Sequence, residues 1–382
     1  MAVERTVAEF FAGIGLMRLG LERAGWHVLW ANDIDEDKHA MYCGHFRNSD
    51  DHFHLGDVHA LAAGDVPSVS LATASFPCND LSLAGARRGL AGQHSSAFWG
   101  FVEAVRSMSP RPPLVLLENV SGFLTSHNGN DFRDACLALN ELGYSVDAFI
   151  IDARLFVPQS RQRMFIVGKR EKGKPGRVAE TPSFYQSQLR PTALADFILW
   201  HPEIDWSIRP LPHIAAKKTT LTDIIEDVPA NSTYWWSRER AEYLLNQMSE
   251  KHRAIADSMI AGKTVTYGTV FRRVRRGRSM AELRTDGIAG CLRTPRGGSG
   301  RQILFAAGKS GYAVRLLTPR ECARLMGADD FKITGSLNKA LFGFGDAVCV
   351  PVITWIAEHY LNPVWKDLYA KEDRRGRSRA TA

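Results

Sequence analysis

The sequence predicts an α/β fold whose mostly parallel sheet presents its functional residues along one edge. Apolar runs typical of buried strands alternate with helical stretches from residue 6 to about residue 169. Several of these runs are followed at once by glycine, acidic or cysteine residues, and open α/β sheets bind ligands at the carboxyl ends of their strands. With 382 residues, 45% of them hydrophobic, the chain is long enough for one large domain and a smaller one.

The composition narrows the class of protein. A net charge of +7 suits a polyanionic partner, although charge alone does not identify one. Six cysteines occur without CxxC pairs, which indicates neither a zinc site nor a disulfide framework, so we expect no metal. Residues 1–6 lack a signal-peptide pattern, and no apolar run approaches about 18 residues. We therefore expect a cytoplasmic protein that has no membrane partner.

A glycine turn follows the first expected strand. The strand covers residues 6–11, the turn residues 11–15 and the next helix residues 16–24. Glycines at such a turn allow a ligand to approach the backbone closely. A second strand, residues 27–31, is followed by Asp33, near the spacing at which an acidic residue binds ribose hydroxyls in nucleotide-binding folds.

The identity of residue 18 narrows the choice of cofactor. A dinucleotide-binding turn would carry its third glycine there, but the residue is Arg18. This favours a nucleoside cofactor without phosphates, such as S-adenosylmethionine, and an ordinary tight turn with an acidic loop is the alternative. Farther along, Asp57 either contacts the cofactor or caps a helix.

A cysteine lies at the end of another expected strand, residues 69–74. The sequence Ser-Phe-Pro-Cys follows it at 75–78. Pro77 fixes its own φ and keeps the preceding residue out of helix, so the backbone entering Cys78 is stiff and extended. We expect Cys78 to be a nucleophile, with a small core residue as the alternative.

Charged residues lie at the ends of the following strands. Glu118 ends an apolar strand, residues 113–117, and either faces the same rim as Cys78 or caps the next turn. Two further strands, 144–152 and 164–168, are separated by the sequence Gln-Ser-Arg-Gln-Arg at 159–163. Arginines at alternate positions point to one side of a strand, which predicts either a substrate clamp or a solvated edge.

The chain changes character after a polar boundary with glycine and proline at residues 169–175. Residues 176–300 show little periodicity, and their basic run 272–278 alternates as a strand or hairpin arm does. Contact with nucleic-acid phosphates is favoured over a solvated basic face. Thr318, followed by a proline, predicts the start of a short helix, and a longer apolar helix is expected over 347–360.

Six motifs occur in one order along the chain: FAGIG at 11–15, FPC at 76–78, ENV at 118–120, QSRQR at 159–163, LTPRE at 317–321 and GDAV at 345–348. The set resembles the DNA (cytosine-5) methyltransferase family of the bacterial type, over residues 6–168 and 315–359. The resemblance implies a Rossmann-like, S-adenosylmethionine-dependent catalytic domain and a smaller, irregular target-recognition domain. The expected divisions are a first catalytic part at 1–175, a recognition domain at 176–305, a return to the catalytic domain at 306–366 and a basic, disordered tail at 367–382.

The resemblance also implies roles for residues at the matching positions. Cys78 is the expected nucleophile and Glu118 the residue that binds the target cytosine, supported by Arg161 and Arg163. The expected contacts to S-adenosylmethionine are Phe11, Gly13, Ile14, Gly15, Asp33, Ile34, Asp57, Val58, Pro77, Asp346 and Val348. The expected contacts to DNA are Ser82, Arg88, Gln159, Arg272, Arg273, Arg275, Arg276 and Arg296.

Four positions depart from the family pattern: Glu9 replaces a frequent Asp, Leu16 a frequent Gly, Asn79 the usual Gln and Asp346 the usual Asn. The additional carboxylate at position 346 is expected to repel an anionic cofactor analogue and to tolerate a sulfonium charge.

The implied activity is methyl transfer to carbon-5 of a cytosine flipped out of duplex DNA. The implied setting is restriction–modification or phage defence, with a monomer that binds DNA in the bacterial nucleoid and a cognate restriction or defence system as partner. The alternatives are methylation of cytosine in transfer RNA, a catalytically silent DNA-binding protein and a nicotinamide oxidoreductase. The intact Cys78, Glu118 and paired arginines argue against a silent protein, and the missing third glycine argues against the oxidoreductase.

Overall fold

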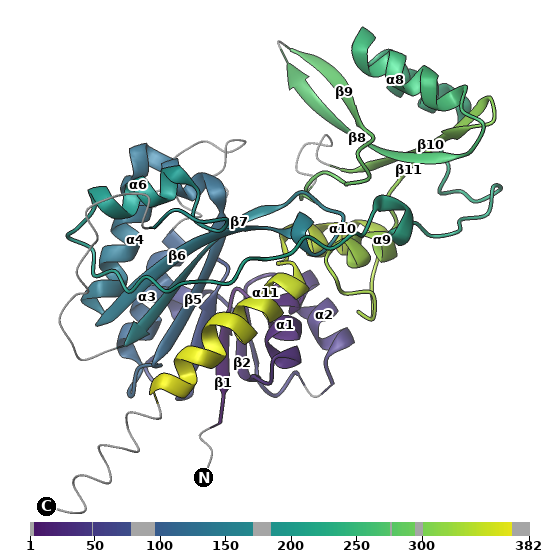
Figure 1. Cartoon of the computed structure of the whole chain (residues 1–382). Helices are drawn as coiled ribbons and strands as arrows, with labels where there is room; N and C mark the ends of the chain where they lie inside the picture. The colour runs from purple at the N-terminus through teal and green to yellow at the C-terminus, as the bar shows by residue number, and fades with distance from the viewer. Residues whose placement is uncertain are drawn as a thin grey trace, which may run out of the picture.

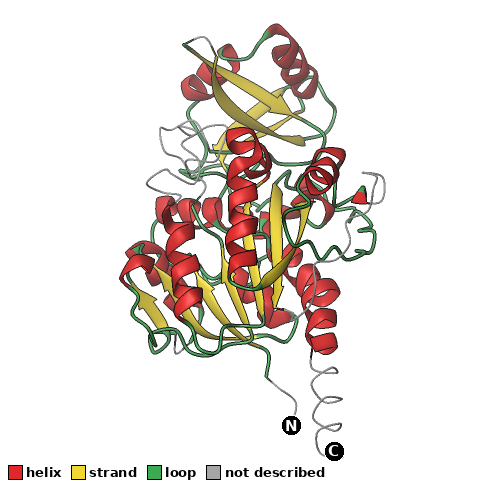
Figure 2. Cartoon of the chain, turned by 90° about the vertical axis from the view of Figure 1, so that its left-hand side faces the viewer, coloured by secondary structure: helices red, strands yellow, loops and turns green. Residues whose placement is uncertain are grey.

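A seven-stranded sheet forms the centre of the larger domain in this computed structural model (Figure 1 and Figure 2). The structure describes residues 4–47, 49–77, 96–170, 185–275, 277–294 and 301–368. The strands run in the order β3-β2-β1-β4-β5-β7-β6. Their bounds are β1 (Thr6–Phe10), β2 (His27–Asp33), β3 (Phe53–Leu55), β4 (Leu71–Ala74), β5 (Leu114–Val120), β6 (Tyr144–Asp152) and β7 (Gln162–Arg170).

The predicted parallel α/β arrangement is confirmed. Strands β1 to β5 pair in parallel, whereas β7 is antiparallel to both β5 and β6. The order of strands reverses between β1 and β4, because β2 and β3 lie to one side of β1 and β4 and β5 to the other. Such a switch point is where open α/β sheets bind their ligands.

Helices cover both faces of the sheet. One face carries α1 (Leu16–Arg23) and α11 (Val350–Ile356), and the other carries α3 (Ser96–Ser107), α4 (Asn130–Glu141) and α6 (Thr192–Trp200). Helix α11 lies directly against α1 (Figure 1), so closely that a Cβ added at Gly20 would lie 2.6 Å from Ile353 Cβ. The last helical segment therefore completes the core beside the first strand.

The remaining helices of the large domain are short. Helix α9 (Pro319–Leu325) begins with the predicted cap at Thr318, whose side chain accepts from the Glu321 amide while the Glu321 carboxylate accepts in return from the Thr318 amide. The others are α2 (Glu36–His45), α10 (Leu337–Asp346), the 3₁₀ segments η1 (Val58–Ala60), η3 (Ser121–Gly129), η4 (Ala153–Leu155) and η5 (Leu221–Ile224), and the π segment η6 (Ala357–Leu361).

The smaller domain is more regular than predicted. It contains an antiparallel sheet in the order β11-β10-β8-β9, visible at the top right of Figure 1. Its own apolar core is contributed by both the sheet and two helices. Its elements are α7 (Arg238–Asn246), α8 (Glu250–Ile260), β8 (Thr266–Arg275), β9 (Arg278–Arg284), β10 (Ile303–Gly308) and β11 (Gly311–Leu316).

The boundaries expected at residues 176 and 305 do not match the edges of this sheet. Helix α6 packs in the core of the large domain, since Leu194 and Ile198 are buried beside Phe132 of α4. The boundary at 305 falls inside β10, which pairs with β8 on one side and β11 on the other. The small domain therefore extends from about α7 to β11.

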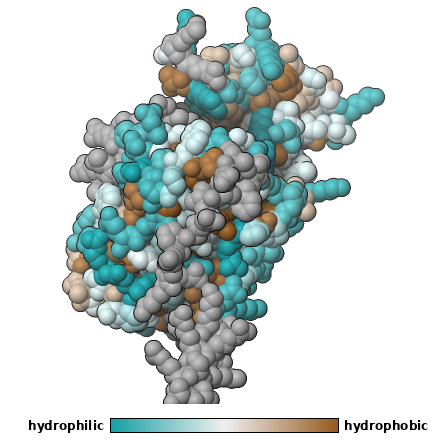
Figure 3. All heavy atoms as spheres, turned by 60° about the vertical axis from the view of Figure 1, so that its left-hand side comes forward, coloured by the Kyte–Doolittle hydropathy of each residue, from teal (hydrophilic) through white to brown (hydrophobic). Residues whose placement is uncertain are grey.

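One helical stretch among the described residues, Leu337–Leu368, is long and apolar enough to cross a membrane by length and composition alone. This differs from the expectation that no apolar run approaches that length. However, 67% of its most apolar window is buried in the protein interior. On the face shown in Figure 3, hydrophilic residues are interspersed with small apolar patches rather than a continuous apolar band.

Candidate active site

The carboxyl ends of three neighbouring strands meet along one edge of the sheet. In the strand register, Phe10 of β1 lies beside Ala74 of β4, and Ala74 lies beside Leu117 of β5. The next residues in each chain segment are the glycine turn, the segment 75–77 and Glu118. The structure thus brings together the elements that the sequence placed at one rim.

The glycine turn has an unusual backbone. Phe11, Gly13 and Gly15 all have left-handed φ angles, of 56°, 57° and 83°, and Gly15 is the N-cap of α1. A Cβ added at Gly13 would meet only the side chain of Lys38, at 4.0 Å. The turn therefore leaves an open cradle next to the backbone, which suits close approach of a ligand.

The end of β2 supplies the groups that a nucleoside requires. The Asp33 carboxylate accepts from the Gly13 amide at 2.8 Å and from the Asp35 amide at 3.0 Å. A carboxylate has about four acceptor sites, so acceptor capacity remains for ribose hydroxyls. The neighbouring Ile34 is an apolar side chain with 68% of its surface exposed, a suitable platform for an adenine ring.

Asp57 caps a helix, which is one of the two roles that the sequence allowed. The Asp57 carboxylate accepts from the His59 amide at 3.0 Å and so caps η1. Asp57 is exposed and Val58 is buried. The open turn, the acceptor sites and the exposed apolar side chain together fit S-adenosylmethionine.

A buried carboxyl group lies beneath the glycine turn. Glu9 Oε1 accepts from the Arg18 amide at 3.1 Å, while Oε2 is buried without a partner. Burial raises the pKa of Glu9 to about 8, although the neighbouring Arg18 opposes the rise. The carboxyl group is therefore mostly neutral at pH 7.

Glu118 and Arg163 form an ion pair at the predicted catalytic edge. Arg163 Nε lies 3.0 Å from Glu118 Oε1, and both side chains are largely buried. Burial raises the pKa of Glu118, and the Arg163 guanidinium opposes this effect. The raised pKa favours a carboxyl group that can donate a hydrogen bond.

Asn119 connects Glu118 to the loop that leads into Cys78. Its Nδ2 donates to the backbone carbonyl of Phe76 at 3.2 Å. Phe76 is buried against Phe98 and Phe123. The sequence motif contained Asn119, but only the structure shows that it fixes the backbone two residues before Cys78.

Arg161 has a different role from the one predicted. The side chain is 2% exposed and donates to the backbone carbonyls of Leu292 at 2.9 Å, Gly345 at 3.1 Å and Ala347 at 2.6 Å. The two terminal nitrogens of the guanidinium therefore bind Arg161 to two distant chain segments, around residues 292 and 345–347, whereas its Nε is buried without a partner. Arg163 is the arginine that pairs with Glu118.

Gln159 was predicted to contact DNA, and the structure contradicts this. The residue has no exposed surface. Its Nε2 donates to the Leu325 carbonyl at 2.8 Å and its Oε1 accepts from the Leu292 amide at 2.9 Å. The amide satisfies buried backbone groups that would otherwise lack partners, so it is not available to DNA.

A second thiol lies near this site and was not predicted. Cys291 Sγ is 3.3 Å from Arg161 Nη1 and 4.0 Å from Arg163 Nη2. Burial opposes ionisation of the Cys291 thiol, but the two arginines outweigh burial and lower its pKa. No motif in the sequence linked residue 291 to the arginines, because about 130 residues separate them.

The expected basic arm is a hairpin, as predicted. Strands β8 and β9 pair with Arg272 opposite Ala281 and Arg275 opposite Arg278. Arg273 is exposed, lies 3.7 Å from Glu282 and stacks over the Phe271 ring. The hairpin thus presents cations on a sheet edge of the small domain.

Several expected site residues lie outside the described part of the chain. Cys78, the expected nucleophile, is the most important of them. The others are Ser82, Arg88, Arg276, Arg296, the side chain of Arg275 and most of the tail at 367–382.

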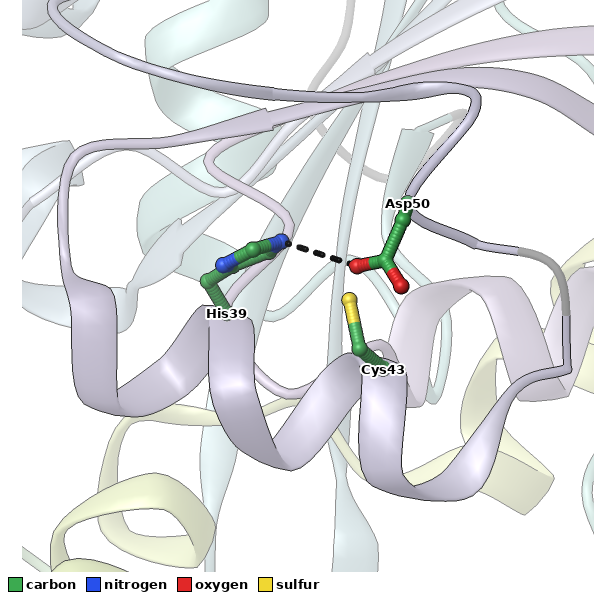
Figure 4. A group of neighbouring side chains, drawn as sticks. All are labelled: His39, Cys43 and Asp50. Carbon is green, nitrogen blue, oxygen red and sulfur yellow. Dashed lines mark ion pairs between the residues drawn. The ribbon is translucent and has the colours of Figure 1, made fainter.

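Three metal-binding residue types come together on α2 and the loop after it. His39, Cys43 and Asp50 have donor atoms within 4.8 Å of one another (Figure 4). His39 Nε2 lies 3.7 Å from Asp50 Oδ1, and burial raises the pKa of the Cys43 thiol. An ordinary surface ion pair next to a protonated thiol accounts for this arrangement without a metal.

Comparison with known proteins places the whole arrangement in one family. The model of C-5 cytosine-specific DNA methylases matches residues 5–362. Type II methyltransferase M.Bsp6I of Bacillus sp. (strain RFL6) is 26% identical, with 92% of this chain and 97% of the relative covered. Type II methyltransferase M.HhaI of Haemophilus parahaemolyticus is 27% identical, covering 91% and 92%. The S. pombe Dnmt2 methyltransferase structure has the same fold, with a TM-score of 0.62, 18% identity and coverage of 95% and 99%.

Proposed function

The chain belongs to the C-5 cytosine-specific DNA methylase family, an S-adenosylmethionine-dependent family of methyltransferases, and from this premise we propose a mechanism and a setting. Cys78 attacks carbon-6 of a cytosine flipped out of duplex DNA, and carbon-5 is methylated in the resulting covalent adduct. A base then removes the carbon-5 proton, and the Cys78 thiolate leaves carbon-6, which releases 5-methylcytosine. The observation that carries this proposal is the buried Glu118–Arg163 pair beside the loop of Pro77.

The geometry at Glu118 supports binding of a cytosine ring. The raised pKa of Glu118 favours a protonated carboxyl group that donates to ring nitrogen-3 and neutralises charge developing on the ring. Arg163, held 3.0 Å from Glu118, is placed to donate to the carbonyl oxygen at carbon-2. Both contacts make carbon-6 more open to attack by a thiolate.

Two residues, Asn119 and Arg161, hold this arrangement in place. Asn119 fixes the Phe76 carbonyl, which keeps the backbone before Cys78 in one position. Arg161 joins β7 to the residues around Ala347. When bound, S-adenosylmethionine supplies an electrophilic methyl group, and the glycine turn and Asp33 would hold it at the same edge.

The small domain supplies the contacts to duplex DNA in this proposal. Flipping a base out of the stack costs a few kcal/mol. Cations such as Arg272 and Arg273 on the β8–β9 hairpin would offset part of that cost by neutralising phosphates. We propose that a monomer acts on a short sequence in duplex DNA within the nucleoid. The curated relatives named type II methyltransferases support restriction–modification, with a cognate nuclease, as the setting.

Labelled S-adenosylmethionine tests the proposal directly. Unmethylated duplex DNA is incubated with wild type, Cys78→Ser and Cys43→Ser, the last as a control for a partly buried thiol on α2. We expect 5-methylcytosine from wild type and Cys43→Ser, and binding of DNA without transfer by Cys78→Ser. Bisulfite sequencing of the product then gives the site.

Two results would overturn parts of this mechanism. Residual transfer by Cys78→Ser equal to wild type would remove Cys78 as nucleophile. Label appearing in transfer RNA assayed in parallel, and not in DNA, would move the chain to an RNA substrate.

A further inference from the structure

An ion pair connects α2 and α10 above the glycine turn. Lys38 Nζ lies 2.8 Å from Asp346 Oδ2. Asp346 is one of the departures from the family pattern, and the structure shows that a cation faces it. The negative charge of Asp346 is therefore balanced in part by Lys38.

The pair lies next to the open cradle of the glycine turn. The Lys38 side chain passes over Gly13, because a Cβ built on Gly13 would lie 4.0 Å from Lys38 Cδ. Helix α10 meets the same turn, since a Cβ built on Gly343 would lie 2.7 Å from Ile14 Cγ2. Lys38 and Asp346 thus lie where α2 and α10 meet the glycine turn.

Both members of the pair are held in position while part of each stays exposed. Asp346 Oδ1 accepts from Thr294 Oγ1 at 2.9 Å, and its Oδ2 accepts from Lys38. The side chains of Lys38 and Asp346 are 21% and 40% exposed. Burial opposes the charge on Lys38, but Asp346 and Asp33 outweigh burial and raise its pKa. The ammonium therefore stays charged at neutral pH.

We infer that Lys38 and Asp346 bind the charged amino-acid end of S-adenosylmethionine as a complementary pair. The Lys38 ammonium faces the cofactor carboxylate, and the Asp346 carboxylate faces the cofactor ammonium. This inference rests on the proposed cofactor position at Gly13 and Asp33. It assigns to Lys38 a contact that neither the family motifs nor the sequence pattern indicated.

A surface ion pair with no ligand would have little consequence. Exposed ion pairs contribute little to stability. Here the Lys38–Asp346 pair is partly buried, anchored by Thr294 and next to an open backbone turn. Charge-assisted hydrogen bonds are stronger than those between neutral groups, so we expect loss of one to weaken binding roughly tenfold.

Calorimetric titration with two ligands distinguishes a direct contact between Lys38 and the amino-acid end of the cofactor from a general structural effect of Lys38 on the binding site. S-adenosylhomocysteine carries both charges of the amino-acid end, whereas 5′-methylthioadenosine lacks that end. We expect Lys38→Met to weaken S-adenosylhomocysteine roughly tenfold and to leave 5′-methylthioadenosine within about twofold. Neither readout depends on turnover.

A matched control is available on the same two helices. Lys339 of α10 pairs with Asp37 of α2 at 2.6 Å, so Lys339→Met removes the same charge and loosens the same helix contact. We expect it to bind both ligands like wild type. The double variant Lys38→Met with Asp346→Asn should bind S-adenosylhomocysteine more weakly than Lys38→Met alone, because it also loses the carboxylate that faces the cofactor ammonium.

Three outcomes would contradict the inference. If Lys38→Met weakens binding of both ligands equally, Lys38 has only a structural effect on the binding site. Unchanged binding of both would mean that the ion pair is a surface feature. If Lys339→Met loses as much affinity for S-adenosylhomocysteine as Lys38→Met does, the change in net charge explains the effect. If wild type binds neither ligand, the cofactor assignment fails first and the inference with it.

Discussion

Replacing Arg161 with methionine should destabilise the large domain. The guanidinium donates to three backbone carbonyls, those of Leu292, Gly345 and Ala347, at 2.6–3.1 Å. A buried polar group left without a partner costs about 1–3 kcal/mol. Methionine fills part of the volume of arginine, and the substitution removes a buried cation. We therefore use the lower end of this range, about 1 kcal/mol, for each of the three carbonyls. The expected loss is therefore roughly 3 kcal/mol.

Thermal unfolding with Arg163→Met as the matched control measures this effect. Arg163 is two residues farther along the chain, in β7, and its side chain pairs with Glu118 and donates to one backbone carbonyl, that of Gln162. Arg161→Met should lower the melting temperature by several degrees. Arg163→Met should lower it less, because Glu118, whose pKa is already raised, can take up a proton when its partner is lost, and should abolish most of the turnover.

The reasoning about Arg161 would be refuted by the opposite pattern. If Arg161→Met unfolds at the temperature of wild type, but loses as much turnover as Arg163→Met, then Arg161 acts on the substrate. The three carbonyls would in that case find other donors. A variant that loses stability and turnover together is compatible only with the positioning role described above.

Two further predictions concern the cofactor end of the sheet. Gly15→Ala should reduce binding of S-adenosylhomocysteine by tenfold or more, because a Cβ at this left-handed φ would overlap the Phe46 ring and come within 2.8 Å of Tyr42. The control variant Gly64→Ala should bind normally, because Gly64 is also left-handed but has open space around it. Equal loss of binding in both variants would show that φ strain is the cause. Burial raises the pKa of Glu9 from 4.5 to about 8, so the stability that this carboxyl contributes is present below pH 4.5 and lost as pH rises through about 8. Glu9→Gln should therefore flatten the fall in melting temperature between pH 4.5 and about pH 8, and an unchanged slope would show that another group titrates.

The strands of the large sheet were predictable because local sequence determines them. Strand β6 (Tyr144–Asp152) matches its predicted range, since apolar runs bounded by turn residues carry the signal. Helix α2 was not predicted, because only Met41 and Tyr42 are buried in it and its apolar pattern is weak. A local signal for the start of this helix was its cap, Asp35. The Asp35 side chain accepts from two backbone amides of the first turn.

The roles of single residues at the site were less predictable. Glu118 lies at the edge of the sheet where the sequence predicted it, because it is close to the carboxyl end of a parallel strand. Arg161 and Gln159 were not, because the backbone groups that they bind lie more than 100 residues away in sequence. A motif shows that a polar side chain is needed, but it does not show whether the partner is a substrate or a buried carbonyl.

The packing of α11 against α1 has a consequence for synthesis of the protein. Residues at the two ends are joined directly, since Asn362 Oδ1 accepts from Arg5 at 2.8 Å and from Trp26 at 2.9 Å. A nascent chain emerging from the ribosome therefore exposes the first strand and helix long before their partners exist. Domains assembled from such distant segments fold late and slowly. Ribosome-bound fragments that stop before α11 should remain dependent on chaperones and lack a completed methyltransferase domain.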